Sequence, residues 1–357
     1  MDVENSCYSH YRTLVIPAPV SCLTFAEPTW LLAGSDDGCV RVYDMTTLKV
    51  TKAIRGLDAV SSVVWRSNGC LWVGSGRRVM AFTLETDKLV LTAADAVTNL
   101  EIGANADDVL NELSINGKGT QLAFCSDLGT VGVLDLQTNR ITQMRQSHGN
   151  ICGTVRFIPD RPSELVSGGY DSTILHFDFS RGGVVSRDDL RGAPPTSSVS
   201  MSPPFVLSMS MSSKGLIAAG TADGRLYVGT GGEKPVTDSV GRQKRRRKWD
   251  GLRSKGKIIA TVAQGPVVAL VFTGPREILT CTLSGRIQYH KICGTATNND
   301  LSVVSEWAQE TKDSFKVNAM AASVNSIIIG GFQKEGRGVI EIWTRIDADG
   351  VNAHESK

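Results

Sequence analysis

Residues 147–179 read SHGNICGTVRFIPDRPSELVSGGYDSTILHFDF, and this stretch decides the fold. It contains three short runs of alternating apolar and polar residues, 153–158, 164–168 and 173–179, separated by tight turns. Alternation over so few residues, with β-branched and aromatic side chains, predicts three β-strands.

Polar residues stand at fixed places around these strands. His148 precedes the first strand, Ser167 ends the second and Asp171 lies in the turn that follows. This layout resembles one blade of the WD-repeat family, in which a His, a turn Asp, a Ser or Thr and a Trp form a hydrogen-bonded chain. Here the aromatic position is Phe177, which has no indole N–H to donate, so we expect a chain of three side chains. No nucleophile elbow accompanies the Ser, and a structural role is therefore favoured over hydrolysis.

The same pattern of apolar strand, small-residue strand, turn and β-branched strand recurs along the chain. The seven recurrences begin at Val20, Val60, Val109, Gly153, Phe205, Pro266 and Lys316. The seventh ends at Trp343 without an outer strand, and the run 12–16 at the N-terminus can supply one. The prediction is an all-β, seven-bladed WD-repeat β-propeller over residues 1–357, closed by pairing of the N-terminal strand with the last blade.

Composition limits where the chain works and what it binds. Its 36 glycines are about a tenth of the chain, as many tight turns require. The eight cysteines are scattered with no Cys-x-x-Cys pair, which favours a reducing compartment and predicts no metal site. No signal peptide and no membrane span are expected, so we place the protein in the nucleus, the cytoplasm or both. No phosphate-binding glycine loop or other cofactor motif occurs.

Two insertions lengthen the repeats. Residues 191–204 are rich in Pro and Ser and predict a flexible loop. Residues 231–256 form a second insertion, and the segment 242–257 (RQKRRRKWDGLRSKGK) holds nine basic residues and one acidic residue. This segment carries +8, so the rest of a chain with net charge +2 sums to −6.

Three interpretations of the basic segment compete. It can be a solvated disordered loop, because like charges repel and little apolar surface is present. It can be a nuclear-import signal, whose residues are Lys244, Arg245, Arg246, Arg247 and Lys248. It can also contact nucleic acid, with Trp249 stacking on a base.

Residues 111–179 resemble the WD repeat-containing protein 53 family more closely than the generic repeat. The likeness rests on the segments 113–114, 134–136, 147–152, 157–162 and 165–171. The resemblance implies a scaffold that acts as a substrate receptor of a cullin-4 ubiquitin ligase, docked through the damage-binding adaptor. Such receptors carry a Trp-Asp-x-Arg signature, and this chain departs from it: Asp178-Phe179-Ser180-Arg181 places the Arg one position late.

The function expected from the sequence is therefore a non-catalytic protein-interaction scaffold, a monomer within a larger complex and without membrane contact. The alternative is a nuclear RNA- or chromatin-associated propeller that uses its basic loop on phosphates. The two differ in salt dependence, because binding through phosphates weakens steeply as salt rises.

Overall fold

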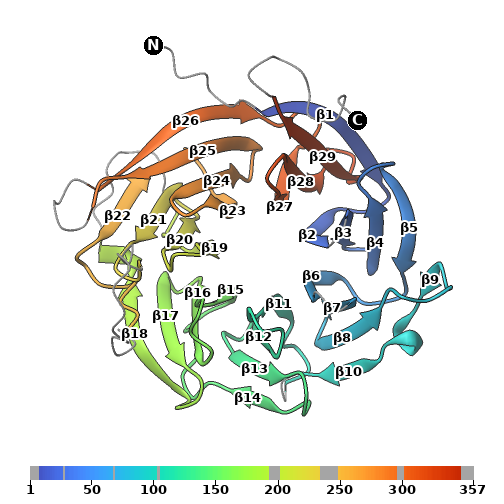
Figure 1. The fold of residues 1–357 in the computed structure, drawn as a ribbon, viewed down its shortest axis with the longest axis horizontal. Coiled ribbons are helices and arrows are strands. Elements are labelled where there is room, and N and C mark those ends of the chain that lie inside the picture. The colour runs from blue at the N-terminus through green and yellow to red at the C-terminus, as the bar shows by residue number, and fades with distance from the viewer. Residues whose placement is uncertain are drawn as a thin grey trace, which may run out of the picture.

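Seven β-sheets stand around a central axis like the blades of a propeller in the computed structural model of this chain (Figure 1). The structure describes residues 8–26, 29–66, 69–102, 105–192, 202–233, 248–295 and 301–346. The predicted all-β, seven-bladed fold is confirmed, and the described residues hold two short 3₁₀-helices and no α-helix.

Each blade has four strands that follow one another outward from the axis, and the sheet of blade 1 gains a fifth, described below. The innermost strands are β2 (Val20–Ala26), β6 (Val60–Arg66), β11 (Leu110–Ile115), β15 (Cys152–Phe157), β19 (Val206–Met211), β23 (Val267–Gly274) and β27 (Lys316–Ala322). The second strands are β3 (Trp30–Ser35), β7 (Cys70–Ser75), β12 (Gln121–Ser126), β16 (Glu164–Gly169), β20 (Ile217–Thr221), β24 (Glu277–Thr282) and β28 (Ser326–Phe332). The third strands are β4 (Cys39–Asp44), β8 (Arg78–Thr83), β13 (Val131–Asp135), β17 (Thr173–Asp178), β21 (Arg225–Gly229), β25 (Arg286–Cys293) and β29 (Gly338–Arg345). The outer strands are β5 (Lys49–Ile54), β10 (Thr98–Glu101), β14 (Ile141–Gln143), β18 (Gly183–Asp189), β22 (Lys257–Thr261), β26 (Ser302–Glu310) and β1 (Tyr8–Ile16).

The two ends of the chain close the ring. Strand β1 pairs antiparallel with β29 from Tyr8 opposite Arg345 to Ile16 opposite Gly338. The two strands, at opposite ends of the colour scale, lie side by side in Figure 1. The predicted closure is confirmed, and the N-terminal strand begins four residues earlier than the sequence indicated. Pairing with β1 covers the outer edge of β29 and joins the two ends of the chain within blade 7.

Sequence patterns did not locate the outer strands of blades 2, 3 and 5, which are β10, β14 and β22. A second departure is β9 (Val90–Leu91), which pairs parallel with β5 and makes the sheet of blade 1 five-stranded. Strand β9 lies in the connection between β8 and β10 of blade 2. This connection therefore adds a short strand to the outer edge of blade 1. A two-residue strand has too little pattern to be read from sequence.

All seven innermost strands bend at the same place. Each has a β-bulge after its first or second residue, at Ser21, Ser61, Asn111, Gly153, Leu207, Val268 and Asn318. A bulge turns one extra residue away from the regular ladder. Here the seven bulged residues all line the central cavity.

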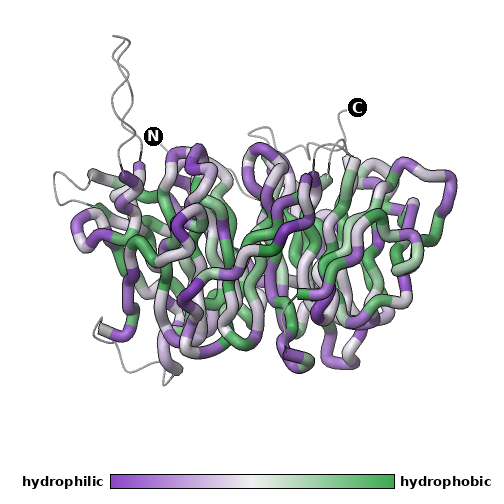
Figure 2. Tube along the Cα trace, turned by 90° about the horizontal axis from the view of Figure 1, so that it is seen from below, coloured by the Kyte–Doolittle hydropathy of each residue, from purple (hydrophilic) through white to green (hydrophobic). Residues whose placement is uncertain are grey.

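The propeller has two different faces. The crossover face carries the turns between second and third strands and the connections from one blade to the next. The hairpin face carries the hairpins between first and second strands and between third and outer strands. Apolar residues run through the middle of the blades and hydrophilic ones gather at the turns on both faces (Figure 2). In the described part of the chain, no helix is long and apolar enough to cross a membrane.

Candidate functional site: buried polar networks and the two faces

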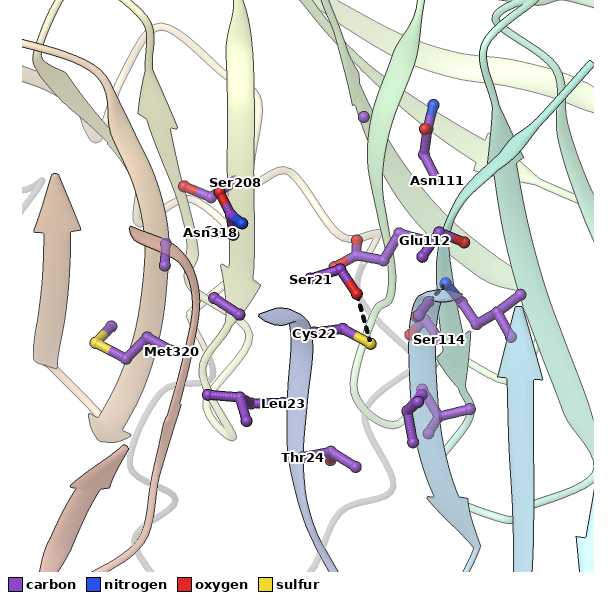
Figure 3. Close-up of a pocket in the computed structure, with 18 of the residues that line it drawn as sticks. Ser21, Cys22, Leu23, Thr24, Asn111, Glu112, Ser114, Ser208, Asn318 and Met320 are labelled. Carbon is purple, nitrogen blue, oxygen red and sulfur yellow. Dashed lines mark hydrogen bonds between the residues drawn. The ribbon is translucent and has the colours of Figure 1, made fainter. Parts of the chain in front are cut away.

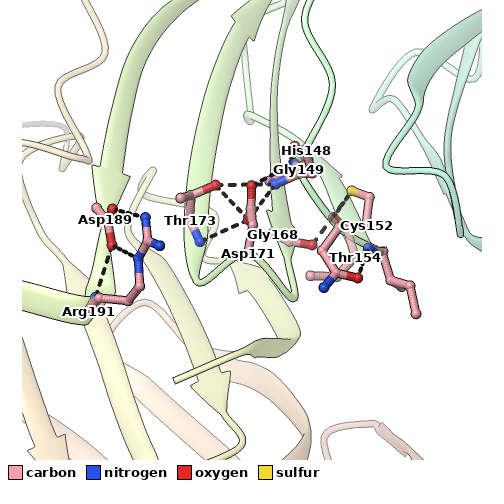
Figure 4. Close-up of polar contacts among 12 residues, drawn as sticks. His148, Gly149, Cys152, Thr154, Gly168, Asp171, Thr173, Asp189 and Arg191 are labelled. Carbon is pink, nitrogen blue, oxygen red and sulfur yellow. Dashed lines mark hydrogen bonds and ion pairs between the residues drawn. The ribbon is translucent and has the colours of Figure 1, made fainter. Parts of the chain in front are cut away.

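The polar residues of blade 4 form one hydrogen-bonded cluster at the crossover face (Figure 4). His148 Nδ1 lies 3.0 Å from Asp171 Oδ1, and His148 Nε2 lies 2.7 Å from Ser167 Oγ. The backbone N–H of Gly149 donates to Asp171 Oδ2 at 3.0 Å. The structure thus brings together all three residues that the sequence singled out.

Thr173 is a fourth member, which the sequence analysis missed. Its hydroxyl donates to Asp171 Oδ1 at 2.8 Å, and its backbone N–H donates to the same oxygen at 3.1 Å. Phe177, at the expected Trp position, is fully buried in the apolar core between blades 3 and 4. The signal was available, because a Thr at the start of a strand can bond a turn Asp two residues earlier.

Charge strengthens this network. Burial disfavours the charged imidazolium, but the interactions with Asp171 and Cys152 together outweigh it and raise the pKa of His148 to about 9. Burial alone would raise the pKa of Asp171, yet the bonds from His148 and from the Gly149 N–H hold that pKa well below its usual range. A charged pair with four donors on the carboxylate stabilises the folded blade at neutral pH.

A Ser–His–Asp chain also occurs in hydrolases, so its accessibility matters. Ser167 is 0% exposed and His148 is 3% exposed. No substrate carbonyl can approach the Ser167 hydroxyl without opening the blade. In this structure the three side chains are enclosed within blade 4, where they connect the turn at Asp171 to the second strand.

Blades 1 and 5 hold the equivalent turn aspartate in another way. In blade 1, Asp37 accepts from Ser35 Oγ at 2.6 Å and forms an ion pair with Arg41 at 2.9 Å. In blade 5, Asp223 accepts from Thr221 Oγ1 at 2.6 Å and pairs with Arg225 at 2.6 Å. An arginine on the third strand thus takes the place of the histidine.

Aspartates at the ends of third strands have a separate structural role. Asp44, Asp135 and Asp178 each accept hydrogen bonds from a backbone N–H and a hydroxyl in the hairpin that follows. Such side-chain caps favour a tight turn. These aspartates stand at the positions of the Trp-Asp dipeptide of WD repeats. In this chain their carboxylates accept hydrogen bonds within the turns.

The innermost strands surround a central cavity of about 470 Å³ (Figure 3). Its polar side includes an ion pair between Glu112 and Arg156, and Glu112 also accepts from the Thr154 hydroxyl and the Val155 N–H, at 2.7 and 2.9 Å. Because Glu112 lies in blade 3 and its partners lie in blade 4, the pair is committed to joining neighbouring blades.

Further side chains cross the seams between blades. Asn318 donates to Val20 O at 2.8 Å, joining blade 7 to blade 1, and Asn111 donates to Cys152 O at 3.0 Å, joining blade 3 to blade 4. Ser21 donates to the carbonyl of Val60. These donors are bulged residues, so the bulge aims them at the next blade. The ring is therefore held together by polar bonds as well as by apolar packing.

The flanks of the basic insertion are firmly attached to the hairpin face. Trp249 is only 3% exposed, packs edge-on to His176 at 4.8 Å and donates its indole N–H to Gly215 O at 2.9 Å. The interpretation of Trp249 as a base-stacking residue is wrong, because its ring is buried between blades 4 and 5. At the other flank, Glu233 forms a two-pronged ion pair with Arg276 of blade 6, at 2.6 and 2.8 Å.

Two further basic residues of the segment 242–257 also form ion pairs. Lys257 pairs with Asp188 at 2.7 Å and Arg253 with Asp250 at 3.1 Å. Of the import-signal residues, Lys248 is exposed, and residues 244–247 lie outside the described part of the chain, as does most of the Pro/Ser-rich loop (193–201). Among the described residues, no group of three or more His, Cys, Asp or Glu side chains is arranged to hold a metal ion.

Comparison with known proteins agrees with this geometry. The family model "WD domain, G-beta repeat" matches residues 9–44, which cover β1 and the first three strands of blade 1. The chain is 25% identical to the WD repeat-containing protein 53 homolog of Dictyostelium discoideum over 247 residues. That alignment covers 63% of this chain and 64% of the relative, so it spans just under two thirds of either protein. The chain is a seven-bladed β-propeller whose residues 9–44 match the WD-repeat model, and it is similar to that relative.

Proposed function

We propose that this protein is a protein-interaction scaffold that serves as a substrate receptor of a cullin-4 ubiquitin ligase. WD-repeat propellers generally act as non-catalytic scaffolds, in which loops on a rigid frame carry recognition. The observation that supports this role is that the buried polar groups have structural partners. The His148–Asp171–Ser167 network stabilises blade 4, and the Glu112–Arg156 ion pair in the cavity joins blades 3 and 4. The exposed loops of the two faces are then the parts left for partners.

Support for the receptor role comes from similarity to the WD repeat-containing protein 53 homolog. The signature arginine of such receptors is absent from the expected position, but Arg181 lies one residue later on the hairpin face. Its side chain is 85% exposed and 3.4 Å from Asp178. We propose Arg181 as the residue that takes the place of the signature arginine in docking the ligase adaptor.

The test is affinity purification of the tagged full-length protein from its native cells at moderate salt, with and without nuclease. We expect the cullin-4 adaptor to be recovered with either treatment, and Arg181→Glu to reduce its recovery several-fold. Arg140→Glu, at the corresponding exposed hairpin of blade 3, is the matched control. Absence of the adaptor from the wild-type sample would overturn the receptor role, and equal recovery with Arg181→Glu would overturn the docking residue.

A second candidate function is a nuclear propeller that contacts RNA or chromatin through its basic loop. The concentration of +8 in residues 242–257 favours it, although Trp249 cannot contribute stacking. Two results would support this function: binding that falls steeply with salt, and loss of binding when residues 234–247 are deleted. For the import interpretation, changing residues 244–248 to Ala should move the protein out of the nucleus. An unchanged distribution would contradict it.

A further inference from the structure

The connection between blades 6 and 7 is held rigidly at the crossover face. The carboxylate of Glu341, on β29, is fully buried and accepts from the backbone N–H groups of Lys312, Asp313 and Ser314, each at 2.9 Å. The Ser314 hydroxyl donates to the same carboxylate at 2.8 Å. One side chain thus fixes three consecutive residues of the connection before it enters β27.

The next residue, Phe315, is presented to solvent by this fixed connection. Its backbone N–H donates to Phe332 O at 2.9 Å, and the two rings meet edge-on at 6.4 Å. Even so, Phe315 is 45% exposed. An aromatic side chain that is anchored on one side and open on the other resembles the anchors that dominate protein interfaces.

Two lysines lie close to the exposed ring, and an exposed arginine shares a turn with one of them. The ammonium groups of Lys316 and Lys334 lie 5.9 and 5.7 Å from the Phe315 ring centre. Arg337, exposed in the same turn as Lys334, adds a third cation. None of the three cations has an ion-pair partner within the described residues. We call Phe315, Lys316, Phe332, Lys334 and Arg337 the Phe315 patch.

We propose that the Phe315 patch binds an acidic peptide segment of a partner protein that carries an apolar side chain. The apolar side chain packs on Phe315, and carboxylates on either side of it pair with Lys316 and Lys334. The inference rests on the proposed scaffold function and assigns it a surface and a class of partner. Because the connection is already fixed, little conformational entropy is lost on binding.

The charges around the patch favour a peptide over nucleic acid. Asp313 and Glu335 are exposed beside it and interrupt the positive surface. A continuous row of phosphates would meet these carboxylates, whereas a peptide needs acidic residues only opposite the lysines. An exposed aromatic flanked by two ammonium groups also gives the apolar–acidic peptide two complementary contacts.

The test is direct binding of a fluorescein-labelled peptide, Asp-Glu-Asp-Trp-Glu-Asp-Glu, to the full-length protein at low salt, followed by fluorescence anisotropy. We expect saturable binding that weakens at least about tenfold, or about 1.4 kcal/mol, in Phe315→Ala and in Lys316→Gln/Lys334→Gln. Val324→Ala and Lys214→Gln, exposed residues of hairpin-face loops, are controls that should leave binding unchanged. Melting curves check that each variant remains folded.

Three outcomes would overturn the proposal: no binding by the wild type, equal binding by the patch variants, or equally strong patch-dependent binding of single-stranded DNA. The last would make the patch a general polyanion site. None of them would remove the scaffold function, which instead fails if affinity purification recovers no stoichiometric protein partner.

Discussion

Blades 4 and 1 hold an aspartate of the same turn with different cations. The strand register makes Gly169 of blade 4 equivalent to Ser35 of blade 1, since they pair with Cys152 and Val20 at the starts of the innermost strands. In blade 4 the space beside Gly169 is filled by the His148 ring, which lies 2.5 Å from the place of a Cβ. In blade 1 the Ser35 side chain occupies that space, and Arg41 approaches from the third strand instead.

The difference shows that, where this turn carries an aspartate, its cationic partner can be an arginine in place of a histidine. A glycine before the turn leaves room for the imidazole. A serine or threonine at that place donates a hydroxyl to the aspartate instead, and an arginine supplies the positive charge that pairs with it. Blade 5, with Thr221 and Arg225, follows blade 1. Blade 4 carries the more buried pair, since the His148 side chain is 0% exposed and the Arg41 side chain 10%. We therefore expect blade 4 to be more sensitive to change.

The largest effect should come from His148→Ala, which leaves Asp171 and Ser167 without their main partner. We expect the free energy of unfolding to fall by about 3 kcal/mol, as when one member of a buried pair is removed. Arg41→Ala in blade 1 should cost only about 1 kcal/mol, because Asp37 is 32% exposed and water can replace the arginine. Urea unfolding measures both, and equal losses would contradict the comparison.

Gly169→Ser transfers the blade 1 arrangement onto blade 4. The added side chain collides with His148, so we expect a loss of about 2 kcal/mol. In the His148→Ala background the ring is gone, and the same substitution should cost at least about 1 kcal/mol less. Additive losses in this double-mutant cycle would show that the His148 ring is not the reason why position 169 needs a glycine.

The two blades should also differ in pH dependence. Because the pKa of His148 is raised to about 9, its stabilisation is complete below pH 6.5 and is lost as pH rises through about 9. The gap in unfolding free energy between wild type and His148→Gln should shrink by on the order of 2 kcal/mol between pH 6 and pH 10.

Arg41→Gln is the matched control for this experiment. Burial raises the pKa of Asp37, but the bonds from Arg41 and Ser35 lower it overall, so that pair weakens only when acid protonates Asp37. The difference in unfolding free energy between wild type and Arg41→Gln should stay constant over the same alkaline range, because arginine keeps its charge. A parallel decline in both variants would refute the assignment to His148.

The smallest effect should come from Thr173→Val, which removes one hydroxyl from Asp171 without changing side-chain shape. We expect a loss of about 1 kcal/mol in unfolding free energy. At the equivalent place in blade 1, Cys39→Val should stay within about 0.5 kcal/mol, since the side chains that bond the Asp37 carboxylate there are Ser35 and Arg41. If Thr173→Val leaves the free energy of unfolding unchanged, the Thr173 hydroxyl does not contribute to the network.

Sequence reasoning reached much of the fold because the information was local and repeated. Alternation of apolar residues recurred seven times, and a missing last strand pointed to the N-terminal run 12–16. His148, Ser167 and Asp171 were found because they stand at fixed places around strands. Trp249 was wrongly predicted to stack on a base because it follows a basic run. Its burial between blades 4 and 5 cannot be predicted from the residues next to it in the sequence.

By itself, the sequence determined the strand period, the number of blades, the closure of the ring and three residues of the blade 4 network, His148, Ser167 and Asp171, since each follows from local pattern. Only the tertiary structure decided the seven aligned bulges, the bonds across the seams, the arginines that replace histidine in blades 1 and 5, and the exposure of Phe315. These depend on which residues of different strands meet in space. Contacts of that kind are set by the packing of blades around the axis, and no periodicity along the chain encodes them.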